Sequence, residues 1–336
     1  MKVDGGVGGD LSLVPDVARQ AEADGYDGVW CAETNQDPFL TLLLTAEHTE
    51  RIEIGTGIAV AFARNPMTLA QSAHDLQRYS GGRLLLGLGS QIRPHITRRF
   101  SMEWSRPAAR MREMILALRA IWATWNDGAE LAFKGEFYTH TLMTPFFTPP
   151  PSEQGPPLVY LAAVGPKMTA VAGEVADGLL AHGFTTPEYL RDVTLPALDM
   201  GATAGGRSRS DVSISLPAFV VTGETDEDTA KAATAVKGQI AFYGSTPAYK
   251  GVLEHHGWGD LHDELNTLSK KKEWKAMGEL VDDDVLEAFA VVAAPDAVAA
   301  GLRDRFGGTV DRLSFYAPYK VPDGLWGQVA AELRDA

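Results

Sequence analysis

The 336-residue sequence has very little cysteine and too few basic residues to balance its acidic ones. Cys31 is the only cysteine, so the chain can form no intrachain disulfide and no cysteine-based metal site. Its 30 Lys and Arg residues against 44 Asp and Glu residues give a net charge of −14, which repels nucleic-acid phosphates and anionic lipid surfaces. These shortages disfavour a disulfide-stabilised secreted domain, a nucleic-acid partner and a membrane-surface role.

Long apolar runs are missing as well. No stretch approaches the roughly 20 residues that span a bilayer. Residues 1–6 lack the basic and apolar regions of a signal peptide and have the character of a first strand. We therefore expect a cytoplasmic protein that does not enter the membrane. Hydrophobic residues make up 45% of the chain, which is enough to bury a sizeable core.

The common short catalytic signatures are also absent. The sequence contains no Walker P-loop, no Gly-x-Ser-x-Gly elbow, no His-Glu-x-x-His and no Cys-x-x-Cys. His255 and His256 are a poor metal pair, because adjacent residues seldom face one ion and no carboxylate spacing supports them. We predict no metal site, and we interpret the Lys-rich run at 270–273 as a solvated face.

What the sequence does contain is a repeated αβ pattern. A helical stretch ends in small or acidic residues, usually with glycine, and an apolar run follows at once, as after residues 25, 82, 177 and 308. Glycine past a helix adopts the left-handed cap conformation, and a short continuous apolar run suits a strand buried on both faces. The predicted strands are 3–7, 28–33, 52–60, 83–90, 158–164, 178–183, 213–221 and 312–317. Amphipathic helices are predicted at 14–23, 39–48, 67–79, 108–125, 167–175 and 230–242.

This alternation predicts the fold class. Eight strands separated by helices favour a closed (β/α)8 TIM barrel, and a doubly wound open sheet is the alternative. We expect one domain over residues 1–336. Two segments depart from the pattern: a Pro-rich, extended connection at 126–157 and an irregular, partly helical insertion at 243–284.

The carboxyl ends of the strands are the candidate site, since a barrel places its chemistry there. The second strand is followed by Glu33, Thr34 and Asn35, while Asp37 before Pro38 is the expected cap of the next helix. Glu33 must either face the mouth or pair inside. Two glycines in the third strand, Gly55 and Gly57, indicate a bulge or the close approach of a ligand or backbone.

The next three strand ends differ in character. Gly87-x-Gly89 resembles a dinucleotide fingerprint only weakly, because the third glycine is missing. The residues from Ala163 to Gly165 lead directly into a helix at Pro166, whose first N–H groups can bind the phosphate of a cofactor. His182 follows the sixth strand and is either a hydrogen-bonded structural residue or a catalyst.

Taken in order, these strand ends resemble the bacterial luciferase-like superfamily and, within it, the F420-dependent oxidoreductases. The segments that carry the resemblance are 28–33, 55–57 with 64–66, 82–90, 159–166 and 176–178. The resemblance implies a TIM barrel that binds a flavin or deazaflavin at its carboxyl-end mouth, usually as a homodimer. In the deazaflavin members the ring carries hydride and does not activate oxygen. A small organic molecule is the expected substrate.

The resemblance also implies roles for particular residues. A cis peptide at Gly57–Ile58 is expected to support the back of the ring, and three basic side chains could hold the anionic tail of F420. The implied cofactor contacts are Gly57, Ile58, Ala59, Gly89, Ser90, Gln91, Ala163, Val164, Gly165, Arg93, Arg98 and Arg99. The implied catalytic positions are Glu33, Thr34, Asn35 and His182.

The sequence departs from the family at one important place. Many relatives carry histidines where this chain has Thr34 and Asn35, and neither of these side chains is a base near neutral pH. Glu33 or His182 is then the expected proton source of a coenzyme F420-dependent hydride transferase. The alternatives are an FMN-dependent monooxygenase of the same fold and a non-catalytic flavin-binding barrel.

Overall fold

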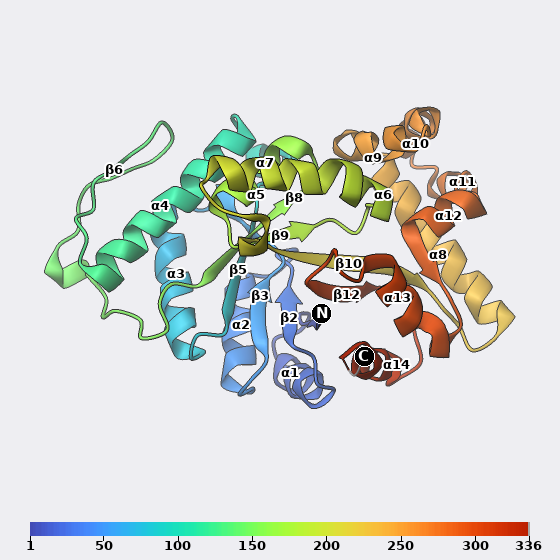
Figure 1. Ribbon diagram of the computed structural model, residues 1–336, viewed down its shortest axis with the longest axis horizontal. Coiled ribbons are helices and arrows are strands. Elements are labelled where there is room, and N and C mark those ends of the chain that lie inside the picture. Colours follow the sequence, from blue (N-terminus) through green and yellow to red (C-terminus); the bar gives the residue numbers. More distant parts are fainter. Residues whose placement is uncertain (335–336) are drawn as a thin grey trace.

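The computed structural model describes residues 1–334 and contains a closed barrel of parallel strands with helices around it (Figure 1). The barrel strands are β1 (Lys2–Gly6), β2 (Gly28–Cys31), β3 (Glu53–Thr56) continued by β4 (Ala59–Val60), β5 (Leu84–Gly89), β8 (Leu158–Ala163), β9 (Gly178–Ala181), β10 (Ser213–Val221) and β12 (Arg312–Tyr316). Parallel pairing of β12 with both β10 and β1 closes the ring. The predicted (β/α)8 barrel is confirmed, and the open-sheet alternative is wrong.

The principal helices include all six whose ranges the sequence predicts. The principal helices are α1 (Val14–Ala23), α2 (Pro38–Glu47), α3 (Pro66–Tyr79), α4 (Pro107–Asp127), α5 (Pro166–Val175), α7 (Leu195–Ala204), α8 (Asp226–Gly244), α13 (Val298–Phe306) and α14 (Leu325–Arg334). Asp37 caps α2 by accepting a hydrogen bond from the Phe39 N–H, and Asn65 caps α3 in the same way. Proline then occupies the first helical turn, where no donor is needed.

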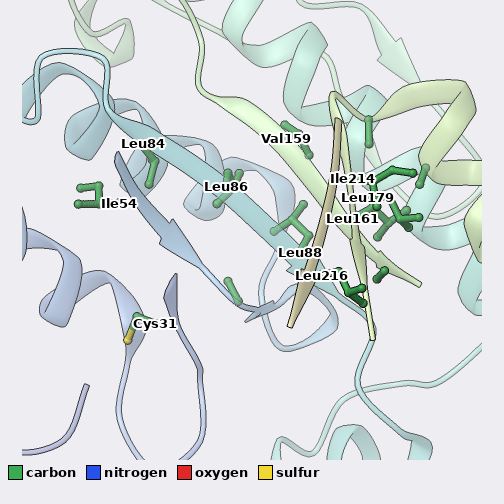
Figure 2. Close-up of a cluster of buried hydrophobic side chains, with 14 of the residues drawn as sticks. Cys31, Ile54, Leu84, Leu86, Leu88, Val159, Leu161, Leu179, Ile214 and Leu216 are labelled. Atoms are coloured by element: carbon green, nitrogen blue, oxygen red, sulfur yellow. The ribbon is translucent and has the colours of Figure 1, made fainter. Parts of the chain in front are cut away.

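The main hydrophobic core lies between the strands and these helices. Leu84, Leu86 and Leu88 are fully buried or nearly so and share one face of β5, because alternate residues of a strand point to the same side. They belong to one cluster with helical side chains such as Leu69 and Ile115. Figure 2 shows how this layer continues from β3 and β5 to β8, β9 and β10.

Polar and aromatic side chains fill the barrel interior before the carboxyl ends of the strands are reached. Arg312 of β12 forms a salt bridge of 2.6 Å with Asp4 of β1, and the Trp30 indole donates a hydrogen bond of 2.8 Å to the same carboxylate. The ring of Trp30 also contacts Tyr160 of β8 at a centroid distance of 5.6 Å. Since β2 and β8 are not neighbours in the sheet, this contact crosses the barrel interior. These side chains therefore fill the barrel interior below the carboxyl ends of its strands.

The two irregular segments differ in how far they agree with prediction. Residues 126–157 begin with the last two residues of α4 and are then mostly irregular, with a short ribbon of β6 (Phe133–Lys134) and β7 (Thr139–His140) and a 3-10 helix η3 (Pro145–Phe147). Residues 243–284 are more helical than predicted. They contain α9 (Lys250–His255), α10 (Gly259–Lys271), α11 (Trp274–Glu279) and the start of α12 (Asp283–Phe289).

These short helices build a second hydrophobic core. Buried side chains such as Leu253, Leu265 and Met277 pack against the end of β10 and against α8. The strand β11 (Ala290–Val292), which no sequence pattern predicted, pairs with β10 outside the barrel ring. In Figure 1 this helical group lies on the β10 and β12 side of the barrel, opposite the β6–β7 ribbon.

Candidate functional site

The barrel is open at the carboxyl ends of its strands. On β9 and just beyond it, Leu180 and His182 are partly exposed, whereas Leu179 and Ala181 between them are buried. The same contrast occurs at Gly57 and Ile58, which are also partly exposed. Solvent therefore reaches the interior-facing residues at this end, and we call this opening the mouth.

Most of the predicted site residues lie together on one side of the mouth. The strands β2, β3, β5 and β8 are consecutive neighbours in the sheet. Their ends carry the predicted residues Glu33, Thr34, Asn35, Gly57, Ile58, Ala59, Gly89, Ser90, Gln91, Ala163, Val164 and Gly165. His182 follows β9, the next strand along. The topology thus assembles strand ends that are far apart in the sequence.

The Glu33 carboxylate is held in a buried ion pair. Its Oε2 atom lies 2.6 Å from Arg64 Nη1 and accepts a hydrogen bond of 2.7 Å from the Val60 N–H, and the side chain is 7% exposed. Arg64 also bridges to Asp37 at 3.0 Å. Glu33 therefore ties the end of β2 to the chain that follows β4. Thr34 and Asn35 are exposed and hydrogen-bonded to each other.

The third strand is broken by a bulge. The peptide bond between Gly57 and Ile58 is cis, as the resemblance implied. The Gly57 N–H donates to the Cys31 carbonyl at 2.8 Å, and the Ile58 carbonyl accepts from the Glu33 N–H. A Cβ atom on Gly55 would lie 2.4 Å from the Trp30 ring. Glycine is therefore needed at position 55 because the Trp30 side chain packs against the backbone there.

The predicted arginines lie on the connection from β5 to α4. Arg93, Arg98 and Arg99 are all exposed, the last two within the π-helical turn η2 (His95–Arg99). The Arg99 guanidinium donates a hydrogen bond to the Thr34 carbonyl. Arg99 therefore fastens this connection over the end of β2. Arg93 and Arg98 form no salt bridge within residues 1–334.

The start of α5 has the features of an anion site. Gly165 is the N-cap residue, no side chain caps the helix, and Pro166 follows in the first turn. A Cβ atom on Gly165 would meet nothing within 4 Å, so the approach to the main chain is open. The uncapped amides and the positive end of the helix dipole suit a phosphate group. Ala163 is buried and Val164 partly exposed at this turn.

His182 lies among aromatic rings on the other side of the mouth. It stacks on Tyr249 at 4.6 Å with an interplanar angle of 26° and meets Tyr243 edge-on at 4.6 Å. Its Nδ1 atom accepts a hydrogen bond of 3.0 Å from the Phe184 N–H, which leaves the proton of the neutral ring on Nε2. Burial lowers the pKa of His182 to about 4. The ring is therefore neutral at physiological pH.

Sequence reasoning missed two residues of this side. Tyr243 is the residue before the last of α8 and Tyr249 lies in the turn η6 (Pro247–Tyr249), so both come from the segment at 243–284 that was expected to be irregular. The Tyr243 hydroxyl is 2.7 Å from that of Tyr316, the last residue of β12. No local motif marks these tyrosines. Only the aromatic content of the segment could have drawn attention to them.

Two features are absent from residues 1–334. No group of three or more His, Cys, Asp or Glu side chains in this range is arranged to hold a metal ion. None of the helices in the same range combines the length and the apolar character that crossing a bilayer requires.

The protein is thus a closed TIM barrel with an open mouth, a bulge after its third strand and an uncapped start of α5. Residues 2–312 match the luciferase-like monooxygenase family, and the chain belongs to that family. An uncharacterized protein of Mycobacterium tuberculosis is 56% identical over 313 residues, which cover 93% of this chain and 92% of that protein.

Two further similarities come from archaea. The 5,10-methylenetetrahydromethanopterin reductase of Methanolobus tindarius is 30% identical over 295 residues, covering 85% of this chain and 84% of the reductase. The solved coenzyme F420-dependent tetrahydromethanopterin reductase of Methanopyrus kandleri superposes with a TM-score of 0.81 at 21% identity, covering 99% and 98% of the two chains. The structural match establishes the fold, and the family match establishes descent.

Proposed function

We propose that the protein is a coenzyme F420-dependent oxidoreductase that transfers a hydride between the deazaflavin and a small organic substrate. The observation that carries this proposal is the uncapped start of α5, which adjoins the strand ends that share one side of the mouth. Kinship with the luciferase-like family and 30% identity to a methylenetetrahydromethanopterin reductase support the same reading. When bound, a deazaflavin supplies hydride chemistry without oxygen activation.

Residues at the strand ends and on the β5–α4 connection would contact the cofactor. The amides of Ala163, Val164 and Gly165 would hold the cofactor phosphate, and the bulge at Gly57–Ile58 would support its ring. Arg93 and Arg98 are exposed cations that could attract an anionic tail in a protein of net charge −14. Glu33 is a positioning residue in this arrangement, because its carboxylate is already bound by Arg64 and the Val60 amide.

A pair of titrations tests the proposal. The purified protein is titrated with oxidised F420 and, separately, with FMN, and the dissociation constants are compared. We expect F420 to bind far more tightly. Tight FMN binding with none for F420 would replace the proposal with an FMN-dependent monooxygenase. Binding of neither cofactor would leave a non-catalytic barrel.

We also propose that the protein is a homodimer. Leu40 and Leu43 of α2 are 55% and 43% exposed, and Tyr79 at the end of α3 is 56% exposed. The two helices contact each other, so these side chains offer apolar area that a second copy could cover. Light scattering coupled to gel filtration would test this, with Leu43→Glu expected to shift the mass toward the monomer. A monomeric wild type would overturn it.

A further inference from the structure

Four side chains form one continuous surface on the β9–β12 side of the mouth. We call His182, Tyr243, Tyr249 and Tyr316 the aromatic wall. All four are partly exposed, whereas Phe184 and Phe219 directly behind them are buried. Tyr316 stacks on Phe219 at 4.7 Å, and Phe184 packs against Tyr249 at 5.7 Å. The wall is therefore the mouth-facing edge of the second hydrophobic core, whose buried rings pack against it.

The wall carries hydrogen-bond donors that the protein itself does not use. The Nδ1 atom of His182 is satisfied by the Phe184 N–H, and its Nε2–H has no acceptor among residues 1–334. The hydroxyl groups of Tyr243 and Tyr316 share one hydrogen bond of 2.7 Å, in which only one of the two protons is used. A ligand at the mouth would thus meet at least two donors.

Within residues 1–334, no charged side chain is among the causes of the pKa shifts of His182, Tyr249 and Tyr316. Burial alone lowers the pKa of His182, and burial, followed by interactions with Tyr243 and Tyr249, raises that of Tyr316. Burial and Tyr243 raise the pKa of Tyr249 to about 12. The groups that face His182 from α8 and η6 are the tyrosine rings, and β12 adds Tyr316. His182, Tyr249 and Tyr316 therefore stay neutral across the physiological range, and an anionic ligand placed against them would lose hydration without gaining a counter-ion.

We propose that the aromatic wall binds the substrate, and that its substrates are uncharged planar compounds with a conjugated carbonyl group. The carbonyl oxygen would accept hydrogen bonds from His182 Nε2–H and from the hydroxyl pair of Tyr243 and Tyr316. Planar conjugated molecules fit because aromatic rings favour offset and edge contacts with other rings. The proposal rests on the proposed function for the source of the hydride.

The donors would assist reduction without giving up their own protons. When a carbon of the conjugated system accepts the hydride, the electron pair of the C=O bond moves to the oxygen, either directly or as the C=C pair shifts into the bond beside the carbonyl carbon. The neutral donors stabilise that developing negative charge, and water at the open mouth supplies the proton. The substrate gains one hydride, which carries both electrons, and one proton from water. The reduced deazaflavin is the reductant. No protein group has to ionise in this scheme.

A matched pair of ligands tests the substrate class. Benzalacetone is an uncharged aryl enone, and cinnamate has the same ring and double bond but ends in a carboxylate. Binding of each to the wild-type protein with bound F420 is measured by isothermal titration calorimetry. We expect the enone to bind at least about tenfold more tightly. Equal binding, or tighter binding of cinnamate, would overturn the neutral character assigned to the wall.

Conservative variants test the donors. Tyr316→Phe and Tyr243→Phe remove one hydroxyl each and keep the ring, so each should raise the dissociation constant of benzalacetone by about three- to tenfold. His182→Gln should weaken binding to a similar extent. Tyr189→Phe is the control, because Tyr189 belongs to the same second core but contacts His255 on its far side. If the three wall variants all bind the enone as the control does, the wall is not the substrate surface.

Two readouts separate this proposal from the proposed function. F420 affinity should be unchanged in Tyr316→Phe, because the hydroxyl belongs to the substrate surface. A wild-type protein that binds benzalacetone but not F420 would refute the proposed cofactor and leave the proposed substrate surface standing. With F420 bound, kcat/KM for the enone should stay flat between about pH 5.5 and 9, because neutral donors do not titrate there. A bell-shaped profile with a pKa near neutrality would show that an ionising group does the work instead.

Discussion

The mouth of the barrel is built differently on its two sides. From β2 to β8 the strand ends offer small residues, backbone amides and a helix start, and the one buried carboxylate there, Glu33, is neutralised by Arg64. From β9 to β12 the mouth is lined by aromatic side chains, two of which come from the end of α8 and from the turn η6. One side is suited to phosphate and a ring held by backbone, and the other to an uncharged organic molecule.

The difference reflects how each side is made. Backbone groups at a strand end are set by local geometry, so a few residues around Gly165 suffice. Aromatic contacts such as that of His182 with Tyr249 join residues far apart in the chain and depend on the second core. We therefore expect changes on the first side to affect the cofactor and changes on the second side to affect the substrate.

The largest expected effect comes from Gly165→Glu. The new side chain has open space, so the barrel should fold, while its bulk and charge block the amides of α5. We expect F420 affinity to fall at least about 100-fold by fluorescence titration. Thr234→Glu adds the same charge on the exposed face of α8 and should have no effect. Retained affinity in a folded Gly165→Glu protein would place the phosphate elsewhere.

The second prediction concerns acid stability on the aromatic side. The folded-state pKa of His182 is about 4, below the ordinary value of 6.5. The unfolded state therefore binds more protons between these values, and the free energy of unfolding should fall as the pH drops through that window. Between pH 7.5 and pH 5, His182 would account for about 2 kcal/mol of that loss. Urea unfolding of the wild type and of His182→Gln at pH 7.5 and pH 5 measures the difference, and parallel losses in both would contradict it.

The third prediction asks whether Glu33 positions the bulge or moves protons. Glu33→Gln removes the charge that pairs with Arg64, so we expect the free energy of unfolding to fall by about 1–2 kcal/mol. F420 affinity and turnover should fall together. The control is Glu174→Gln, which breaks the more exposed pair with Arg112 and should cost less. Lost turnover with unchanged cofactor affinity would restore a proton-transfer role for Glu33.

The smallest expected effect is that of Arg98→Gln. Arg98 is exposed and has no salt-bridge partner within residues 1–334, so its removal should weaken F420 binding by only about two- to fivefold at low salt. Long-tailed F420 should be affected more than the tail-less deazaflavin riboside. Lys270→Gln removes the same charge from the exposed end of α10 and is the control. Equal losses for both cofactor forms would show that the tail lies elsewhere.

Much of the first side could be predicted from sequence. The caps Asp37 and Asn65, the start of α5 after Gly165 and the positions of all eight barrel strands follow from spacing over a few residues. Such signals act within one turn or one strand. They predict the structure correctly because local propensity, hydrophobic pattern and tertiary packing all favour the same barrel. The cis bond at Gly57 was expected only because the sequence resembles a known family.

The sequence by itself determined the order of strands and helices, the excess of negative charge and the residues placed at each strand end. The tertiary structure alone decided which of those residues meet. Asp4 pairs with Arg312, 308 positions away, and Glu33 pairs with Arg64 instead of facing the open mouth. His182 contacts tyrosines at the end of α8 and in η6. Periodicity and capping encode neighbours along the chain, whereas these partners are fixed by the closing of the barrel and the packing of the second core.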